Sequence, residues 1–252
     1  MKKPGIRSAA YLTQVVSEPS HPVPYPAFSR GELKVFERFF RYVWKATPSF
    51  FALHGVTFEA DDEEDISFAV ATVIDQLTSK RAEDFAWFLD VFQYEGLAAM
   101  RPNFSRSSIR KQCDFAFRRA ALVSGRLRTL DCLFAEAKVV SPDHTMGYYA
   151  SSGIKRFLEG SYAYAMPQAV LIGYVRETDQ TLPKALSDHF NRKDKKEQLE
   201  ILQWPTPFVP SRAGAIRMYV TQHERRVPNE EGEKKPGPIT IFHLWLHVNS
   251  DR

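Results

Sequence analysis

The chain has few cysteines and no long apolar run. Its 252 residues include two cysteines, Cys113 and Cys132, which are too few for a disulfide framework and too far apart for a CxxC zinc knuckle. No apolar run approaches the roughly 20 residues that a membrane-spanning helix needs. The amino-terminal Met-Lys-Lys is followed by no apolar signal segment. These absences predict a cytoplasmic protein with reduced thiols and no membrane association.

Acidic residues are scarce between Arg101 and Arg128. That stretch holds eight basic residues and Asp114 as its single acid, a net charge of +7, whereas the whole chain carries +4. Because solvated surfaces usually mix charges of both signs, this bias predicts a surface for a polyanion such as nucleic acid. Arginine predominates, which suits bidentate phosphate contacts. The candidate nucleic-acid contacts are Arg110, Lys111, Arg118, Arg119, Arg126 and Arg128.

The residue pattern predicts three parts. Residues 1–28 form a proline-rich leader, residues 29–100 a helical part, and residues 101–252 an α/β core that ends in two strands. No internal repeat and no nucleotide-binding motif occurs. Helices are expected over 31–46, after the acidic cluster at 61–65, and over 81–94, 151–166 and 183–203. Strands are expected over 113–122, 127–140, 169–175, 215–222 and 239–248.

Two groups of potential metal ligands have simpler interpretations. The acidic cluster Asp61–Asp65 precedes a helical pattern, and acids favour the positive end of a helix dipole. We therefore interpret it as a helix start rather than a metal site. His243 and His247 share a face of one predicted strand, four residues apart with Trp245 between them, which is far for one zinc ion. We therefore expect these two residues and His223 to be packing or edge histidines.

The apolar stretch Leu130–Val140 carries a charged pair, Glu136 and Lys138. Its composition predicts a buried strand, and residues two apart on a strand share a face. Buried charge is costly unless it is paired. The pair is therefore either an ion pair on an edge strand or the centre of a functional site, and we favour the site.

A second carboxylate for such a site comes from Asp114 or Asp131. Asp131 is five residues from Glu136 on the same strand and therefore faces the other way. A three-residue hairpin turn sets Asp114 opposite Glu136, on the same face. It also sets Arg119 opposite Asp131. A two-residue turn would instead set Asp114 opposite Ala135, so the sequence alone leaves the choice open, and we favour Asp114.

The order of helices, a hairpin with Glu-x-Lys on its second strand, a helix and a buried strand resembles the PD-(D/E)XK nuclease superfamily. The resemblance covers about Arg101–Arg176, where Glu136-Ala137-Lys138 matches the second part of the family motif. No Pro-Asp pair precedes it, so the first acid departs from the pattern. The resemblance implies an α+β protein with an α/β core of restriction-endonuclease-like fold, in which helices flank a mixed sheet.

The same resemblance implies a metal-dependent phosphodiesterase that cleaves nucleic acid. Asp114, Glu136 and Lys138 would be catalytic, and Asp114, Glu136 and the carbonyl of Ala137 would bind Mg²⁺ or Mn²⁺. Lys155 and Arg156, near the start of the next helix, add two candidate phosphate contacts. The expected partners are nucleic acid, with DNA favoured over RNA, an ATPase or helicase subunit, and a second copy of the chain. A role in restriction or antiviral defence follows by analogy alone.

Two other interpretations stay open at the level of sequence. The chain is alternatively a non-catalytic nucleic-acid-binding or partner subunit that retains the nuclease-like fold. It is otherwise an α+β protein whose Glu-x-Lys is only an ion pair. A second acid close to Glu136 would favour the nuclease over both alternatives.

Overall fold

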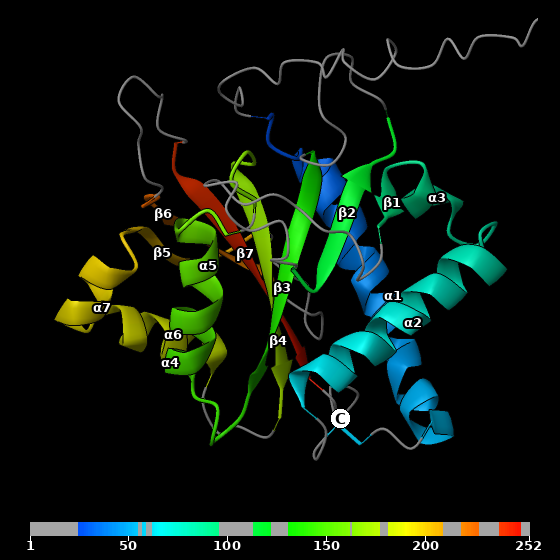
Figure 1. Cartoon of the computed structure of the whole chain (residues 1–252), viewed down its shortest axis with the longest axis horizontal. Coiled ribbons are helices and arrows are strands. Elements are labelled where there is room, and N and C mark those ends of the chain that lie inside the picture. Colours follow the sequence, from blue (N-terminus) through cyan, green and yellow to red (C-terminus); the bar gives the residue numbers. More distant parts are fainter. Residues whose placement is uncertain are drawn as a thin grey trace, which may run out of the picture.

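The computed structural model describes residues 25–54, 57–58, 62–95, 113–121, 131–161, 163–176, 181–208, 218–226 and 237–247. Helices and strands form a mixed α/β arrangement, with helices on both sides of one sheet (Figure 1). The helices are α1 (Arg30–His54), α2 (Glu63–Lys80), α3 (Ala86–Leu89), α4 (Met146–Tyr148), the π-helical segment η1 (Tyr149–Ile154), α5 (Lys155–Leu158), α6 (Leu182–Phe190) and α7 (Lys193–Gln198). The strands are β1 (Phe92–Tyr94), β2 (Phe115–Arg119), β3 (Cys132–Val140), β4 (Gln168–Val175), β5 (Ile201–Pro207), β6 (Met218–His223) and β7 (Ile239–His247).

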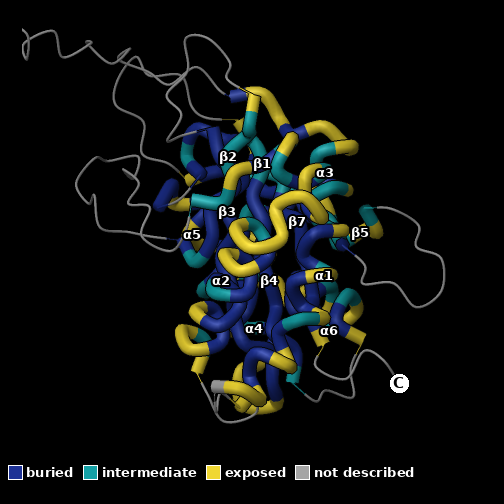
Figure 2. The backbone as a smooth tube through the Cα atoms, turned by 90° about the vertical axis from the view of Figure 1, so that its right-hand side faces the viewer, coloured by how far each residue is buried: buried dark blue, intermediate teal, exposed yellow. Residues whose placement is uncertain are grey.

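The seven strands form one mixed sheet in the order β1-β2-β3-β4-β7-β6-β5. The three central strands β3, β4 and β7 are parallel to one another, whereas the strands outside them pair antiparallel. Central parallel strands are covered by helices on both faces and therefore consist of nearly continuous apolar residues. Every residue of β3 is buried, and so are seven of the eight in β4. Figure 2 shows this buried interior surrounded by more exposed helical turns.

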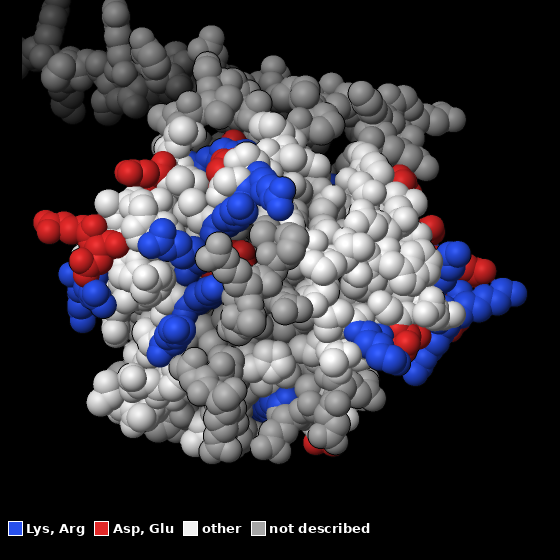
Figure 3. Space-filling model, turned by 180° about the vertical axis from the view of Figure 1, so that it is seen from behind, with Lys and Arg blue, Asp and Glu red and all other residues white. Residues whose placement is uncertain are grey.

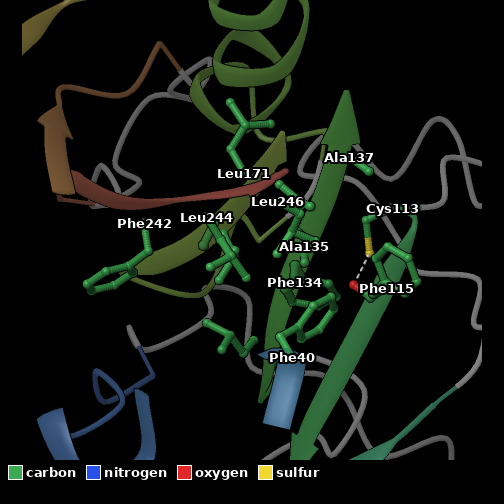
Figure 4. Close-up of a cluster of buried hydrophobic side chains, with 14 of the residues drawn as sticks. Phe40, Cys113, Phe115, Phe134, Ala135, Ala137, Leu171, Phe242, Leu244 and Leu246 are labelled. Carbon is green, nitrogen blue, oxygen red and sulfur yellow. Dashed lines mark hydrogen bonds between the residues drawn. The ribbon is translucent and has the colours of Figure 1, made fainter. Parts of the chain in front are cut away.

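Helix α1 supplies much of the aromatic core on one face of the sheet. The ring of Phe40 packs edge-on against Phe115 of β2, with centroids 5.9 Å apart. Trp44 stacks on Tyr174 of β4 at 5.8 Å. Figure 4 shows Phe40, Phe115 and Ala135 in this cluster, where the Cys113 thiol donates to the Phe115 carbonyl at 3.1 Å. The sheet and α1 are thereby joined into one packed unit.

The start of α1 has the capping arrangement that its sequence indicates. The hydroxyl of Ser29 accepts from the Glu32 amide at 3.2 Å, and the Glu32 carboxylate accepts from the Ser29 amide at 2.6 Å. The predicted end before Pro48 is wrong, because the helix continues through Pro48 to His54. Burial of Phe50 and Phe51 favours the roughly two further turns, and the Thr47 hydroxyl donates to the Val43 carbonyl at 2.8 Å.

Other element boundaries also differ from the prediction. The helix expected over 81–94 shortens to α3, and the chain then extends as β1, which pairs with β2. The helix expected over 183–203 divides into α6 and α7 and is followed by the edge strand β5. The helix expected over 151–166 begins at Met146 and ends at Leu158. In the first two cases, pairing of β1 with β2 and of β5 with β6 outweighed the local helical pattern.

None of the helices in the described ranges has the length and apolar character needed to cross a membrane.

Candidate metal centre

The site lies along an edge of β3 that its neighbour β2 leaves uncovered. The last pair between these strands is Phe115 with Ala135, whereas β3 continues beside β4 as far as Val140. Beyond Ala135, backbone groups of β3 that would bond a strand on the β2 side need other partners. The amide of Ala137 donates to the Asp114 carboxylate at 2.7 Å. The Asp114 carboxylate thus accepts the hydrogen bond that a longer β2 would accept from β3.

The hairpin register that we favoured is confirmed within the described residues. Phe115 pairs with Ala135 and Arg118 with Cys132, and the same alignment extended by one residue sets Asp114 opposite Glu136. At the other end Arg119 forms an ion pair with Asp131 at 2.5 Å. Asp131 therefore belongs to a structural pair and not to the acid cluster. The turn itself lies outside the described residues.

Helix α2 adds a third acid that our sequence interpretation missed. Asp62 caps the helix by accepting from the amides of Glu64 and Asp65, as expected for an acidic helix start. Glu63, in the first turn, instead directs its carboxylate to β3 and forms an ion pair with Lys138. The acidic cluster Asp61–Asp65 is therefore both a helix start and the source of a site residue. The interpretation as a helix start is confirmed for Asp62, Glu64 and Asp65, whereas Glu63 joins a group of potential metal ligands that this interpretation did not include.

Three carboxylates converge beside the part of β3 that β2 leaves unpaired. One oxygen each from Glu63, Asp114 and Glu136 lies within 4.8 Å of the others. Glu136 is 1% exposed, and its Oε2 atom has no hydrogen-bond partner among the described residues. Carboxylate oxygens at this spacing suit a hard divalent cation, and an unpartnered buried carboxylate oxygen offers a ligand position. The residues present therefore fit a hard divalent cation.

The ammonium group of Lys138 lies among these oxygens. Its Nζ atom is 2.9 Å from Glu136 Oε1, donates to the Ala137 carbonyl at 2.6 Å and forms a hydrogen bond with Glu63. The side chain is 2% exposed. Lys138 thus contacts two of the three acids and the carbonyl that the sequence assigned to the metal, so it supplies positive charge where a cation would also bind.

Arg156 also contacts the cluster, through Glu136. It comes from α5 and forms an ion pair with Glu136 Oε1, while its own side chain is 45% exposed. The predicted phosphate contact thus lies beside the acid cluster with part of its guanidinium at the surface. Lys155 points away: its side chain is 64% exposed and pairs with Glu159 at 3.5 Å.

Burial shifts the protonation of all three acids. Burial first, and then the nearby charge of Asp114, raise the pKa of Glu136 to about 7. Burial also raises the pKa of Asp114 and of Glu63, although Lys138 lowers both. Burial lowers the pKa of Lys138 itself, but Glu136 and Glu63 outweigh that effect, so its pKa is raised. The Lys138 ammonium therefore does not fully compensate the burial of the three carboxylates, and a further cation would stabilise their charged forms.

The other predicted nucleic-acid contacts divide into two groups. Arg118 pairs with Glu95 at 2.6 Å and bonds Gln93 across β1. Arg119 is 10% exposed, pairs with Glu32 and Asp131, and stacks on Phe28 at 3.8 Å. Both side chains make internal contacts, and the geometry lends no support to a phosphate contact for Arg119. The remaining candidates, Arg110, Lys111, Arg126 and Arg128, lie outside the described residues.

His223 and His243 are buried, as expected for packing histidines, whereas His247 at the end of β7 is exposed. His243 contacts the hydroxyls of Tyr149 at 3.0 Å and Thr221 at 2.9 Å, and His223 bonds the Leu199 carbonyl at 2.7 Å. Among the residues that the structure describes, only the cluster of Glu63, Asp114 and Glu136 gathers enough potential ligands for a metal ion.

Comparison with known proteins gives no relative. No protein-family model, no curated protein and no solved structure matches this chain.

Proposed function

We propose that the chain is a metal-dependent nuclease that hydrolyses phosphodiester bonds in nucleic acid, with DNA as the favoured substrate. The observation that carries this proposal is the convergence of Glu63, Asp114 and Glu136 on one buried edge of β3, beside Lys138. The resemblance of the Glu136-Ala137-Lys138 segment to PD-(D/E)XK nucleases supports the same chemistry. A role in restriction or antiviral defence rests on that resemblance alone.

The residues have separable tasks in this proposal. A divalent cation held by the three carboxylates and the Ala137 carbonyl would polarise the phosphodiester and lower the pKa of an attacking water. Lys138 stabilises the negative charge that develops on the phosphate oxygens, in a buried setting where such stabilisation is strong. Arg156 fixes the orientation of Glu136 and presents its exposed part to a substrate phosphate.

A cleavage assay with matched variants tests the proposal. Plasmid and oligonucleotide substrates are incubated with Mg²⁺, with Mn²⁺ and with EDTA. We expect metal-dependent cleavage by the wild type and a loss of roughly 10²-fold or more in Glu63→Gln and Glu136→Gln, since each removes a ligand of the cation. Glu64→Gln is the control, because Glu64 is the exposed neighbour of Glu63 on the same helical turn. Wild-type inactivity with every metal, or equal loss in Glu64→Gln, would contradict the proposal.

A non-catalytic nucleic-acid-binding subunit is the second candidate. It is favoured by one observation: Lys138 and Arg156 already pair with Glu136, and Lys138 also pairs with Glu63. A cluster partly neutralised by its own chain need not bind a metal. Nucleic-acid binding without cleavage by the wild type would favour this alternative, in which an ATPase, a helicase subunit or a second copy of the chain would supply further activity.

A further inference from the structure

Helix α1 presents a continuous basic row on its outer side. Residues three or four apart on a helix share one face, and this spacing joins the basic residues of α1 into a line on the side away from the core. We call this line the α1 stripe. Figure 3 shows lysine and arginine side chains in a diagonal row over this helix. The stripe consists of Arg30, Lys34, Arg38, Arg41 and Lys45.

Few acids offset the charge of the α1 stripe. The acids on the helix are Glu32 and Glu37. Glu32 pairs with Arg119 of β2, at 2.9 Å, and so turns away from the stripe. Glu37 pairs with Arg41, also at 2.9 Å. No ion pair joins any of the other four cations of the stripe to a described residue, so the stripe keeps an excess of positive charge.

The middle of the stripe surrounds an open hollow of about 280 Å³. Its lining consists of Arg38, Arg41, Tyr42 and Lys45. Tyr42 is 47% exposed, and the guanidinium of Arg38 lies over the ring of Trp87 at 4.4 Å, which holds it in place. Three cations and a phenol hydroxyl around one hollow can bind a phosphate group through charge-assisted hydrogen bonds.

The inner side of α1 holds the stripe rigidly. Phe36, Phe39 and Phe40 are fully buried. Phe39 stacks on Phe88 of α3 at 3.7 Å, and Phe36 packs edge-on against Phe117 of β2 at 5.2 Å. At a rise of about 1.5 Å per residue, the stripe is a fixed line of charge roughly 22 Å long. That length corresponds to about six base pairs along a duplex axis.

We propose that the α1 stripe binds the phosphate backbone of double-stranded nucleic acid, as a surface separate from the acidic cluster. A rigid line of cations matches the regular charge of a duplex. Proteins that bind single strands rely on several aromatic platforms for successive bases, whereas the hollow offers the single exposed ring of Tyr42. The proposal extends the proposed nuclease activity, but it concerns binding alone and is tested without metal.

The test compares two triple variants with equal charge loss. Lys34→Gln/Arg38→Gln/Lys45→Gln removes three cations of the stripe and leaves the Arg41–Glu37 pair intact. Lys184→Gln/Arg192→Gln/Lys193→Gln removes two lysines and one arginine from exposed positions around α6 and α7. Affinity for a duplex oligonucleotide is measured in EDTA over a range of salt concentrations, after circular dichroism and thermal melting establish that each variant folds.

We expect the stripe variant to lose at least tenfold in duplex affinity, with the slope of log K against log salt smaller by about 2.7, since each phosphate contact contributes about 0.9. The control variant should retain the wild-type slope. An unchanged slope in the stripe variant, or an equal change in the control, would overturn the proposal. So would an equal loss of single-strand affinity, or a loss confined to an acidic polypeptide such as polyglutamate. Failure of the nuclease proposal is distinguishable, because it appears as absent cleavage with duplex binding in EDTA intact.

Discussion

Lys138 is a buried lysine with three oxygen partners. Its ammonium group contacts Glu136 and Glu63 and donates to the carbonyl of Ala137. Those are also groups that a divalent cation would use, so lysine and metal compete for part of the same space. In the proposed reaction, however, Lys138 stabilises charge that forms on the substrate. The residue should therefore weaken metal binding and accelerate cleavage at the same time.

The substitution Lys138→Met separates these two effects. Methionine retains much of the apolar stem and removes the charge. We expect tighter Mn²⁺ binding, nearly normal duplex affinity, and a cleavage rate lower by roughly 10²–10³-fold, as when one electrostatic stabiliser is removed. Calorimetry, gel-shift titration and a cleavage time course on one preparation measure the three quantities.

The matched control for this substitution is Lys184→Met, because Lys184 is exposed and pairs with Asp188 on α6. It should behave as the wild type in all three measurements. Full cleavage activity in a folded Lys138→Met protein would show that this lysine has no catalytic role.

At the scale of elements, a buried polar chain ties η1 to the far strands of the sheet. The hydroxyl of Tyr149 lies 3.0 Å from His243 Nδ1. Thr221 Oγ1 lies 2.9 Å from His243 Nε2 and 2.8 Å from His223 Nε2. Burial lowers the pKa of His223 to about 4 and that of His243 to about 3. Both rings are thus neutral in the folded protein at neutral pH.

Because both histidines of this hydrogen-bonded network are neutral when folded, we expect the free energy of unfolding to fall in acid. Both histidines have folded-state pKa values below the ordinary value of 6.5, so the unfolded chain binds more protons below that pH. Their contribution is complete above pH 6.5 and is lost as the pH falls toward 4, at up to about 1.4 kcal/mol per pH unit for each ring. The acids of the metal centre, whose pKa values are raised, change stability in the opposite direction.

A comparison of variants isolates the histidine contribution. Chemical unfolding of wild type and His223→Gln is followed from pH 7 to pH 4. The stability difference between them should shrink as the pH falls, whereas His144→Gln, at a histidine outside the polar chain, should follow the wild type. A difference between wild type and His223→Gln that stays constant over this range would contradict the assigned protonation.

The elements that the sequence predicted best are those with strong apolar patterns. The strands β3, β4 and β7 lie close to their predicted positions, because continuous burial leaves a clear apolar run. The strand β5 was missed, since its Pro205 and Pro207 disfavour a strand and its burial is partial. Both prolines are tolerated because β5 is an edge strand with register shifts. The local sequence pattern predicted one helix over 183–203, and it could not show that α7 ends at Gln198 and that β5 begins at Ile201.

At the scale of the whole molecule, the fold joins acids from three distant parts of the chain. Glu136 and Asp114 were predictable, because a hairpin register relates them through alternation of strand faces. Glu63 was not, because its place depends on how α2 packs beside β3, which no local pattern encodes. Its acidic neighbours Asp62, Glu64 and Asp65 also have an adequate local explanation as a helix start. The acid cluster and the separate α1 stripe are the two features on which the proposed action on a polyanionic substrate rests.

Metal binding tests the central claim most directly. Isothermal titration calorimetry with Mn²⁺ and Mg²⁺ compares the wild type with Glu63→Gln, Glu136→Gln and Glu64→Gln. We expect the wild type to bind the metal, Glu63→Gln and Glu136→Gln to bind at least tenfold more weakly, and Glu64→Gln to bind as the wild type does, because only the first two carboxylates lie in the cluster. Absence of metal binding by the wild type, or equal weakening in Glu64→Gln, would contradict a metal centre at this site.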